Sequence, residues 1–218
     1  MPKVSIILTT HGQAPYLKQA IGSVLAQTFE DWECIVATDG PYDIARDAIS
    51  DSRLRYWYFD DIPDVPCRFA RSINSAFQYA KGDFITYLCH DDLYLPWRLE
   101  MMVRYFKTAP LGAADVCFGW QRLMDEVNGE MHLAGEGFTR QGNPEQPAGT
   151  VDHSSVMHRR ECFEKAGGWD EEAPMRYGDA YFWARLQAAG YKFHCIPEVL
   201  DAHRFNPHSV SWKEDHPS

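Results

Sequence analysis

Short apolar runs alternate with amphipathic stretches through the first half of the chain. The runs are almost continuously apolar, which is typical of strands that a parallel sheet buries on both faces. The stretches between them repeat apolar residues at helical spacing, so we expect helices there. The pattern predicts strands at Val4–Leu8, Trp32–Thr38, Leu54–Phe59 and Phe84–Leu88, and helices that begin near Pro15, Tyr42, Arg68 and Trp97.

This alternating order predicts an α/β fold, with a mostly parallel central sheet and helices on both of its faces. In such sheets, ligands bind beyond the carboxyl ends of the strands. Polar and turn residues follow three of the four strands, namely Thr9, Thr10 and His11, then Asp39 and Gly40, then His90, Asp91 and Asp92. Because these strand ends meet at one edge of the sheet, we expect a binding site there.

The second half of the chain has a less regular pattern. It predicts a strand and hairpin first, then a loop rich in Gly and Pro, and finally short strands around two helices. The expected strands are Asp115–Met124, Met131–Leu133, Val151–His158, Lys192–Pro197 and Glu198–His203; the loop is Gly135–Gly149, and the helices are Arg160–Ala166 and one from Tyr177 onward.

The strongest chemical signal is the stretch Gly82–Pro96, which reads GDFITYLCHDDLYLP. Asp91 and Asp92 follow a buried strand, where two adjacent carboxylates are costly unless a cation compensates them. A divalent ion that also holds a diphosphate fits this position, because Mg²⁺ prefers oxygen ligands and phosphates. A strand-to-helix turn with a solvated Asp pair would explain the same residues, since Asp is a good helix cap.

Composition narrows the choice of ligand. The chain has 218 residues, with 21 Lys and Arg against 31 Asp and Glu, a net charge of −10. This balance argues against broad binding to nucleic acid or to anionic membranes, but not against a single nucleotide. Neither G-x-G-x-x-G after the first strand nor G-x-x-x-x-G-K-[ST] is present. A metal, rather than a glycine-rich loop, is therefore the expected holder of phosphate.

Localisation signals point to the cytoplasm. The six cysteines are scattered without a C-x-x-C pair, which favours reduced thiols over disulfides or zinc ligands. The opening MPKVSIILTT has too short an apolar run for a signal peptide, and no run of about 18 apolar residues predicts a membrane span.

Four segments carry a resemblance to a known family. They are VSIILTTHGQAPYLKQAIGSVLAQTFEDWECIVATDG, ITYLCHDDLYLPWRL, VDHSSVMHR and WDEEAPMRYGDAYFWARL. Over nearly its whole length the chain resembles the family-two inverting glycosyltransferases of the GT-A fold, and within them the spore coat polysaccharide biosynthesis glycosyltransferase. The resemblance implies one GT-A domain over residues 1–218, with a nucleotide-binding half at 1–110 and an acceptor-binding half at 111–218.

On the donor side, the resemblance implies five roles. Thr9 and Asp39 would contact the nucleoside, with Asp39 accepting from the ring N–H of uracil or thymine. Arg68 would lie over the nucleotide or its phosphates. Asp92 would be the direct ligand of Mg²⁺ or Mn²⁺, and Asp91 would reach the ribose or the metal shell.

On the acceptor side, the resemblance makes Asp179 the catalytic base, and Asp152 and His153 would line the acceptor. The chemistry agrees, because a leaving diphosphate needs a metal and an attacking hydroxyl needs a carboxylate to take its proton. An inverting reaction places that base opposite the leaving group, away from the metal pair. We expect burial beside Tyr177, Phe182 and Trp183 to raise the pKa of Asp179. A charge that only complements the helix dipole is the alternative.

Two departures from the family pattern keep other functions open. The family's R-x-H-x-x-S-x-S segment corresponds to Arg204–Ser211, with Asn206 in the His position, so His203 or His208 would have to replace it. Gly178 stands where the family commonly has Glu. We expect a transferase that uses a UDP- or dTDP-sugar and a sugar or glycoconjugate acceptor, in cell-surface polysaccharide or glycoconjugate synthesis. A nucleotidyltransferase and a catalytically degenerate nucleotide-sugar-binding module are the alternatives.

Overall fold

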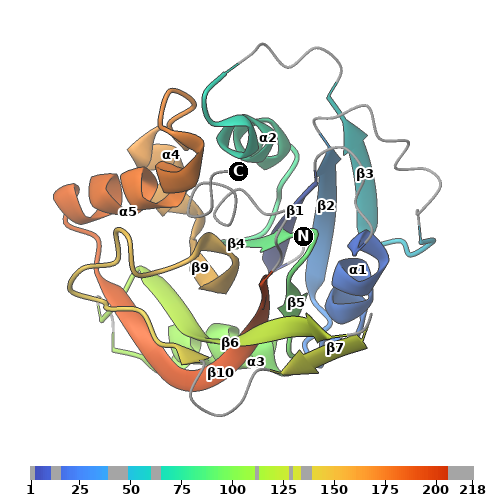
Figure 1. Cartoon of the computed structure of the whole chain (residues 1–218). Coiled ribbons are helices and arrows are strands. Elements are labelled where there is room, and N and C mark those ends of the chain that lie inside the picture. The colour runs from blue at the N-terminus through green and yellow to red at the C-terminus, as the bar shows by residue number, and fades with distance from the viewer. Residues whose placement is uncertain are drawn as a thin grey trace.

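In the part of the chain that it describes, a computed structural model shows one ten-stranded mixed sheet between two layers of helices (Figure 1). The strand order is β3-β2-β1-β4-β9-β6-β10-β5, and β7 and β8 both pair with β6. The residues described are 3–10, 16–38, 49–59, 65–110, 113–127, 130–133 and 139–205.

The first four strands are parallel and lie as the apolar runs predict. They are β1 (Val4–Thr10), β2 (Trp32–Thr38), β3 (Leu54–Tyr58) and β4 (Phe84–Cys89). Thr9 of β1 is in register with Ala37 of β2 and with Cys89 of β4. The carboxyl ends of three strands therefore reach the same edge of the sheet, next to Asp91 and Asp92.

The strands of the second half join this sheet through an antiparallel strand. Strand β9 (Val156–Arg159) runs antiparallel between β4 and β6 (Val116–Val127), and β10 (Phe193–Phe205) pairs parallel with β6. The predicted hairpin is confirmed, because β7 (Glu130–Leu133) pairs antiparallel with β6. Two short strands were not predicted, namely β5 (Leu93–Tyr94), which pairs with β10, and β8 (Thr139–Arg140), which pairs with β6.

Two expectations for this half were wrong. The first part of the expected strand Val151–His158 is a 3-10 helix, η2 (His153–Ser155), because the Asp152 side chain accepts from the backbone N–H of Ser154 at 2.9 Å and turns the chain. The two short strands expected after Lys192 are the single strand β10. Its register shifts between Ile196 and Val199, next to Pro197, which has no N–H to donate to the ladder.

Helices cover both faces of the sheet, as predicted. Helices α1 (Leu17–Leu25) and α3 (Arg98–Thr108) share one apolar core with inward residues such as Ile6. Helices α2 (Arg68–Phe77), α4 (Arg160–Ala166) and α5 (Gly178–Ala188) share the other with Ile7, whose side chain points to the opposite face. Figure 1 shows α4 and α5 beside one another at the left. The helix expected from Tyr42 lies almost wholly outside the described residues.

Among the described helices, none is both long and apolar enough to cross a bilayer. The six cysteines, all in the described part of the chain, are free.

Two glycines of the first half make a matched test of this packing. A Cβ on Gly82 would lie 2.5 Å from the backbone N of Ser5, whereas a Cβ on Gly22 in α1 would meet nothing within 4 Å. We expect Gly82→Ala to destabilise the fold by about 2 kcal/mol or more, since neighbouring backbone would have to move. Gly22→Ala should stabilise it by about 0.5 to 1 kcal/mol, because Ala favours a helix interior. Urea unfolding of both variants tests these two predictions. Equal changes in the free energy of unfolding would contradict them.

Candidate active site

Asp92 is the most heavily bonded carboxylate at the carboxyl end of β4. It is 1% exposed, and its Oδ2 accepts from the Ser154 hydroxyl at 2.7 Å. Its Oδ1 accepts from the backbone N–H of Arg204 at 3.1 Å and lies 3.1 Å from His203 Nδ1. Contacts from η2 and β10 therefore fix this carboxylate from two sides.

Asp91 is held through its backbone. Its carbonyl oxygen accepts from Arg204 Nε at 2.9 Å, while Arg204 Nη2 donates to Gln19 of α1 at 2.8 Å. The Arg204 guanidinium also lies 3.7 Å from the centre of the Tyr16 ring. Arg204, which is 1% exposed, thus joins the acidic turn to the start of α1.

Asp152 connects the acidic pair to Asp179. Ligand-type atoms of Asp92, Asp152 and His203 all lie within 4.8 Å of one another, and so do those of Asp152, His153 and Asp179. A third such group contains Cys89, Asp91 and Asp92. The three groups overlap, so one continuous line of acidic side chains runs from β4 to the start of α5.

Asp179 lies in the first turn of α5, and its Oδ1 accepts from the backbone N–H of Ala180 at 2.7 Å. Burial, with a smaller contribution from the charge of Asp152, raises the pKa of Asp179 to about 6. Phe182 and Trp183 are fully buried, while Tyr177 is 50% exposed. The predicted rise in the pKa of Asp179 by burial is therefore confirmed.

Thr9 and Arg68 approach the same region. The carbonyl oxygen of Thr9 accepts from the backbone N–H of His90 at 3.1 Å. Arg68 is the first residue of α2, and its neighbours Cys67 and Phe69 lie so close to Gly178 that a Cβ there would come within 2.7 Å of each. The Gly178 that replaces the family's Glu thus permits close packing of α2 on the start of α5.

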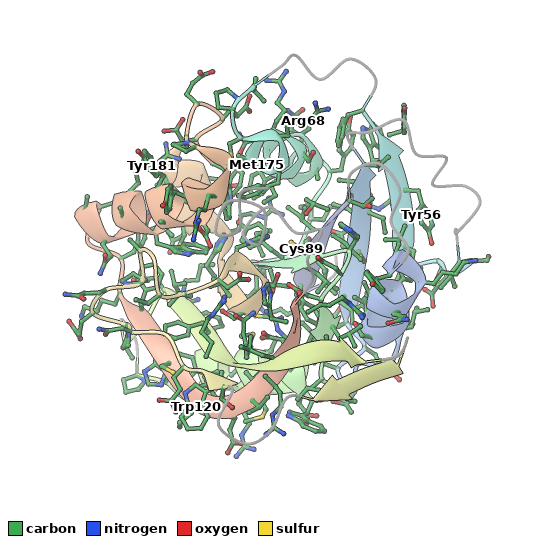
Figure 2. All side chains as sticks on the ribbon, in the orientation of Figure 1. Tyr56, Arg68, Cys89, Trp120, Met175 and Tyr181 are labelled. Atoms are coloured by element: carbon green, nitrogen blue, oxygen red, sulfur yellow. The ribbon has the colours of Figure 1, made fainter. Side chains whose placement is uncertain are left out.

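Of the other residues expected in the site, some lie in the described part of the chain and some outside it. Asp152 and His153 lie between the acidic pair and Asp179, as described above. Asp39, Asn206 and His208 are outside the described residues. In Figure 2, Cys89 marks the middle of this region at the end of β4, while Tyr181 of α5 points outward at the left.

The donor set fits a divalent cation. Asp91, Asp92 and Asp152 offer carboxylate oxygens, the ligands that Mg²⁺ and Mn²⁺ prefer, and His203 adds a ring nitrogen. These side chains come from separate elements and gather in a largely buried place, where mutual repulsion of three carboxylates favours a cation.

Burial and the charges within the cluster raise the pKa of Asp91 and lower the pKa values of Asp92 and Asp152. Burial raises the pKa of Asp91, and the charge of Asp92 raises it further. Burial also opposes ionisation of Asp92 and Asp152. Burial is the largest single effect on each, but the positive charge of His203, together with further hydrogen bonds and charges, outweighs it, so both pKa values are lowered. His153 and Arg140 also lower the pKa of Asp152, and Arg140 Nη1 lies 3.4 Å from Asp152 Oδ2.

His203 should make the stability of the metal-free protein depend on pH. Burial lowers its pKa, but the charge of Asp92 and their hydrogen bond outweigh burial and raise it to about 9. A raised histidine pKa stabilises the fold fully below about pH 6.5, the unfolded value, and the stabilisation is lost as pH rises through 9.

We therefore expect His203→Gln in EDTA to cost about 2 to 3 kcal/mol at pH 6.5 and much less at pH 9.5. Urea unfolding at both pH values measures this difference. His194→Gln, on the exposed part of the same strand β10, is the matched control. A cost for His203→Gln that does not change with pH would contradict the assigned ion pair.

Sequence reasoning left His203 open and did not single out Ser154, Arg204 or Arg140. Ser154 lies within the quoted VDHSSVMHR segment, and Arg204 opens the late R-x-H-like segment, so both motifs carried a signal. No motif marked Arg140, because its position beside Asp152 depends on the pairing of β8 with β6, which the sequence did not predict.

Two solved structures share this architecture. Residues 1–349 of S. aureus TarS, in complex with UDP-GlcNAc, match 95% of this chain and 60% of that chain with a TM-score of 0.67 and 14% identity. The mannosyltransferase PcManGT from Pyrobaculum calidifontis, in complex with GDP-Man and Mn²⁺, matches 97% of this chain and 60% of that chain with a TM-score of 0.66 and 15% identity. Likeness at this identity shows the fold, and the chain has the GT-A fold of these glycosyltransferases.

The family follows from sequence. The model of glycosyl transferase family 2 matches residues 5–167, and the chain belongs to that family. Protein CgeD of Bacillus subtilis (strain 168) is 37% identical over 222 residues, which cover 95% of this chain and 51% of CgeD. The chain thus spans about half the length of this relative.

Proposed function

We propose that the chain is an inverting, metal-dependent glycosyltransferase that moves a sugar from a UDP- or dTDP-sugar to the hydroxyl group of a sugar or glycoconjugate acceptor. The observation that carries this proposal is the continuous line of side chains from Asp91 and Asp92 to Asp179. This line supports a cation-binding group at one end of the site and a separate, less acidic carboxyl at the other.

The donor side is assigned to residues 1–110, with Thr9, Asp39 and Arg68 as nucleotide contacts. Asp92, with Asp91, Asp152 and His203 near it, would hold Mg²⁺ or Mn²⁺. When bound, such an ion neutralises charge on the departing diphosphate. The complexes of TarS with UDP-GlcNAc and of PcManGT with GDP-Man and Mn²⁺ support a nucleotide-sugar donor and a metal. The choice of a pyrimidine nucleotide depends on the resemblance at Asp39.

The acceptor side is assigned to residues 111–218, with Asp179 as the base. As the acceptor oxygen bonds to the anomeric carbon, Asp179 takes its proton and the bond to the diphosphate breaks. The pKa of about 6 leaves Asp179 mostly ionised at pH 7, and it is a stronger base than an exposed carboxylate. Separation of the base from the acidic pair suits attack on the face opposite the leaving group, which gives inversion.

The pathway belongs to the same proposal. The resemblance of the four sequence segments to the spore coat polysaccharide biosynthesis glycosyltransferase supports a role in cell-surface polysaccharide or glycoconjugate synthesis. The free cysteines support a cytoplasmic site of action.

A thermal-shift panel tests the donor assignment. UDP, dTDP, GDP, CDP and ADP are each added with Mn²⁺, with Mg²⁺ or with EDTA. Because a ligand of the native state stabilises it by RT ln(1 + [L]/Kd), UDP or dTDP should raise the Tm with metal and not with EDTA. Absence of any metal-dependent shift would favour a degenerate module. Release of pyrophosphate from UTP and a sugar 1-phosphate would instead indicate a nucleotidyltransferase.

A further inference from the structure

Arg98 is a fully buried cation outside the line of acidic side chains. It is the first residue of α3, and its side chain is 0% exposed. Its Nε lies 3.4 Å from Asp201 Oδ2, and its guanidinium lies 3.8 Å from the centre of the Tyr94 ring. Because a guanidinium keeps its charge in proteins, and burial of an unpaired charge is costly, such a residue is held by specific partners.

The Arg98 guanidinium binds the backbone where η2 meets β9. Its Nη2 donates to the carbonyl oxygen of Ser154 at 2.9 Å and to that of Val156 at 3.3 Å. Ser154 belongs to η2, and Val156 is the first residue of β9. Nε and Nη2 of one planar group thus join α3 to β10 and to this junction, an arrangement that the point charge of a Lys ammonium does not reproduce.

Ser154 joins this anchor to two acids of the candidate site. Its hydroxyl donates to Asp92 Oδ2 at 2.7 Å, and its backbone N–H donates to Asp152 Oδ1 at 2.9 Å. Ser154 is itself fully buried. Its hydroxyl, N–H and carbonyl therefore each have a partner, and its position governs how far apart the carboxylates of Asp92 and Asp152 lie.

We propose that Arg98 is a positioning residue for the cation site: by holding Ser154, it keeps the carboxylates of Asp92 and Asp152 at a separation that one divalent cation bridges. This inference rests on the proposed function, and it adds to it a residue that does not touch the cation. Ligand-type atoms of Asp92 and Asp152 lie within 4.8 Å of one another. Because Mg²⁺ demands near-ideal ligand geometry, a small displacement of η2 would weaken its binding.

A set of variants separates this role from that of an ion pair which only stabilises the core. Arg98→Lys keeps the positive charge but loses the planar set of donors, whereas Asp201→Asn removes the charged partner and keeps the contacts to the two carbonyls. The double variant Arg98→Met, Asp201→Leu replaces both groups with apolar side chains, a change that often leaves stability intact. Arg104→Lys, on an exposed residue of α3, is the matched control.

Titration with Mn²⁺, alone and then with UDP or dTDP, measures the effect on the cation. Free Mn²⁺ is followed by electron paramagnetic resonance, so no turnover is needed. We expect Arg98→Lys and the double variant to bind Mn²⁺ about 10- to 100-fold more weakly than the wild type, the usual effect of losing a group that orients a metal ligand. Asp201→Asn and Arg104→Lys should bind it as the wild type does.

Hydrogen exchange in EDTA tests the anchor without any metal. In Arg98→Lys, exchange in the peptide of residues 150–158 should be at least about 10-fold faster than in the wild type, with a much smaller change in the peptide of residues 32–38, because the lost contacts hold η2 locally. An equal rise in both peptides would indicate a general loss of stability and overturn the positioning role.

The outcomes separate this inference from the proposed function. Wild-type Mn²⁺ affinity in a folded Arg98→Lys, or equal losses in Arg98→Lys and Asp201→Asn, overturns the positioning role, while Mn²⁺-dependent binding of UDP or dTDP by the wild type keeps the proposed function. If the wild-type protein binds no Mn²⁺ under any of these conditions, the metal-dependent function and this inference are both overturned.

Discussion

Asp179→Asn is expected to lower the rate of sugar transfer by about 10³-fold, within the range of positioned acid–base groups. The Asn side chain keeps the size of the carboxyl but cannot take the proton of the acceptor hydroxyl. Metal-dependent binding of UDP or dTDP should remain, because the acidic pair at the end of β4 is untouched. Single-turnover kinetics, with the thermal shift measured in parallel, separate the two effects.

The same substitution has two further consequences. Wild-type activity should fall below about pH 6, where Asp179 becomes protonated, and any residual activity of the variant should lack that dependence.

Because the folded pKa is raised above the unfolded one, the ionised carboxyl destabilises the fold at neutral pH. Asp179→Asn should therefore stabilise the protein by up to about 3 kcal/mol at pH 7. A variant that gains stability and loses turnover fits an active-site acid.

Asp83→Asn is the matched control for this experiment. Asp83 lies just before β4, is exposed and pairs with Lys3 at 2.7 Å. Its removal should change neither turnover nor the pH profile. Equal turnover in Asp179→Asn and Asp83→Asn would exclude Asp179 as the base.

Asp92→Asn is expected to weaken metal-dependent nucleotide binding by at least about 100-fold. Asp92 is a member of two of the three ligand groups, so its loss affects the cation from both sides. An amide oxygen is a neutral and weaker ligand for a hard cation than a carboxylate. Titration of UDP or dTDP with Mn²⁺, followed by Tm, measures the loss.

The control for Asp92→Asn must show that the fold is intact. Asp92 accepts from Ser154 and Arg204 and pairs with His203, so the far-ultraviolet circular dichroism and unfolding cooperativity of the variant are compared with the wild type. Asp83→Asn again serves as the surface variant. If a folded Asp92→Asn variant keeps the wild-type affinity for the nucleotide, either the metal binds elsewhere or nucleotide binding does not need it.

Strands β1, β2 and β4 could be predicted because they are buried on both faces, whereas β3, at the edge of the sheet, is only partly buried. Strand β2 matches its predicted bounds Trp32–Thr38, and every residue in it is buried. The acidic pair was equally visible, since Asp91 and Asp92 directly follow β4. Local pattern and strand topology together were enough to place both at one edge of the sheet.

The partners of these acids could not be predicted, because they depend on tertiary pairing. His203 meets Asp92 across 111 positions of sequence, through the pairing of β10 with β5 and β6. The 3-10 turn at His153 also overrode an apolar pattern that favoured a strand, since the hydrogen bond from Ser154 to Asp152 stabilises the turn locally. That turn is what brings Asp152 between Asp92 and Asp179.

Asp152 gives the two ends of the site a physical connection. It belongs both to the group with Asp92 and His203 and to the group with His153 and Asp179. Its negative charge helps to raise the pKa of Asp179, while the positive charge of His203 lowers its own. A cation bound at Asp92 and Asp152 would therefore reduce the repulsion felt by Asp179 and couple donor loading to the strength of the base.

Real-time NMR of nucleotide-sugar hydrolysis tests the central claim most directly, because water replaces the unknown acceptor. With Mg²⁺ and an α-linked UDP- or dTDP-sugar chosen by the thermal-shift panel, the anomer of the released sugar is followed before it mutarotates. We predict that the β anomer appears first in the wild type and that Asp179→Asn abolishes its formation. Initial release of the α anomer, or the same rate in Asp179→Asn, would contradict an inverting transferase with Asp179 as its base.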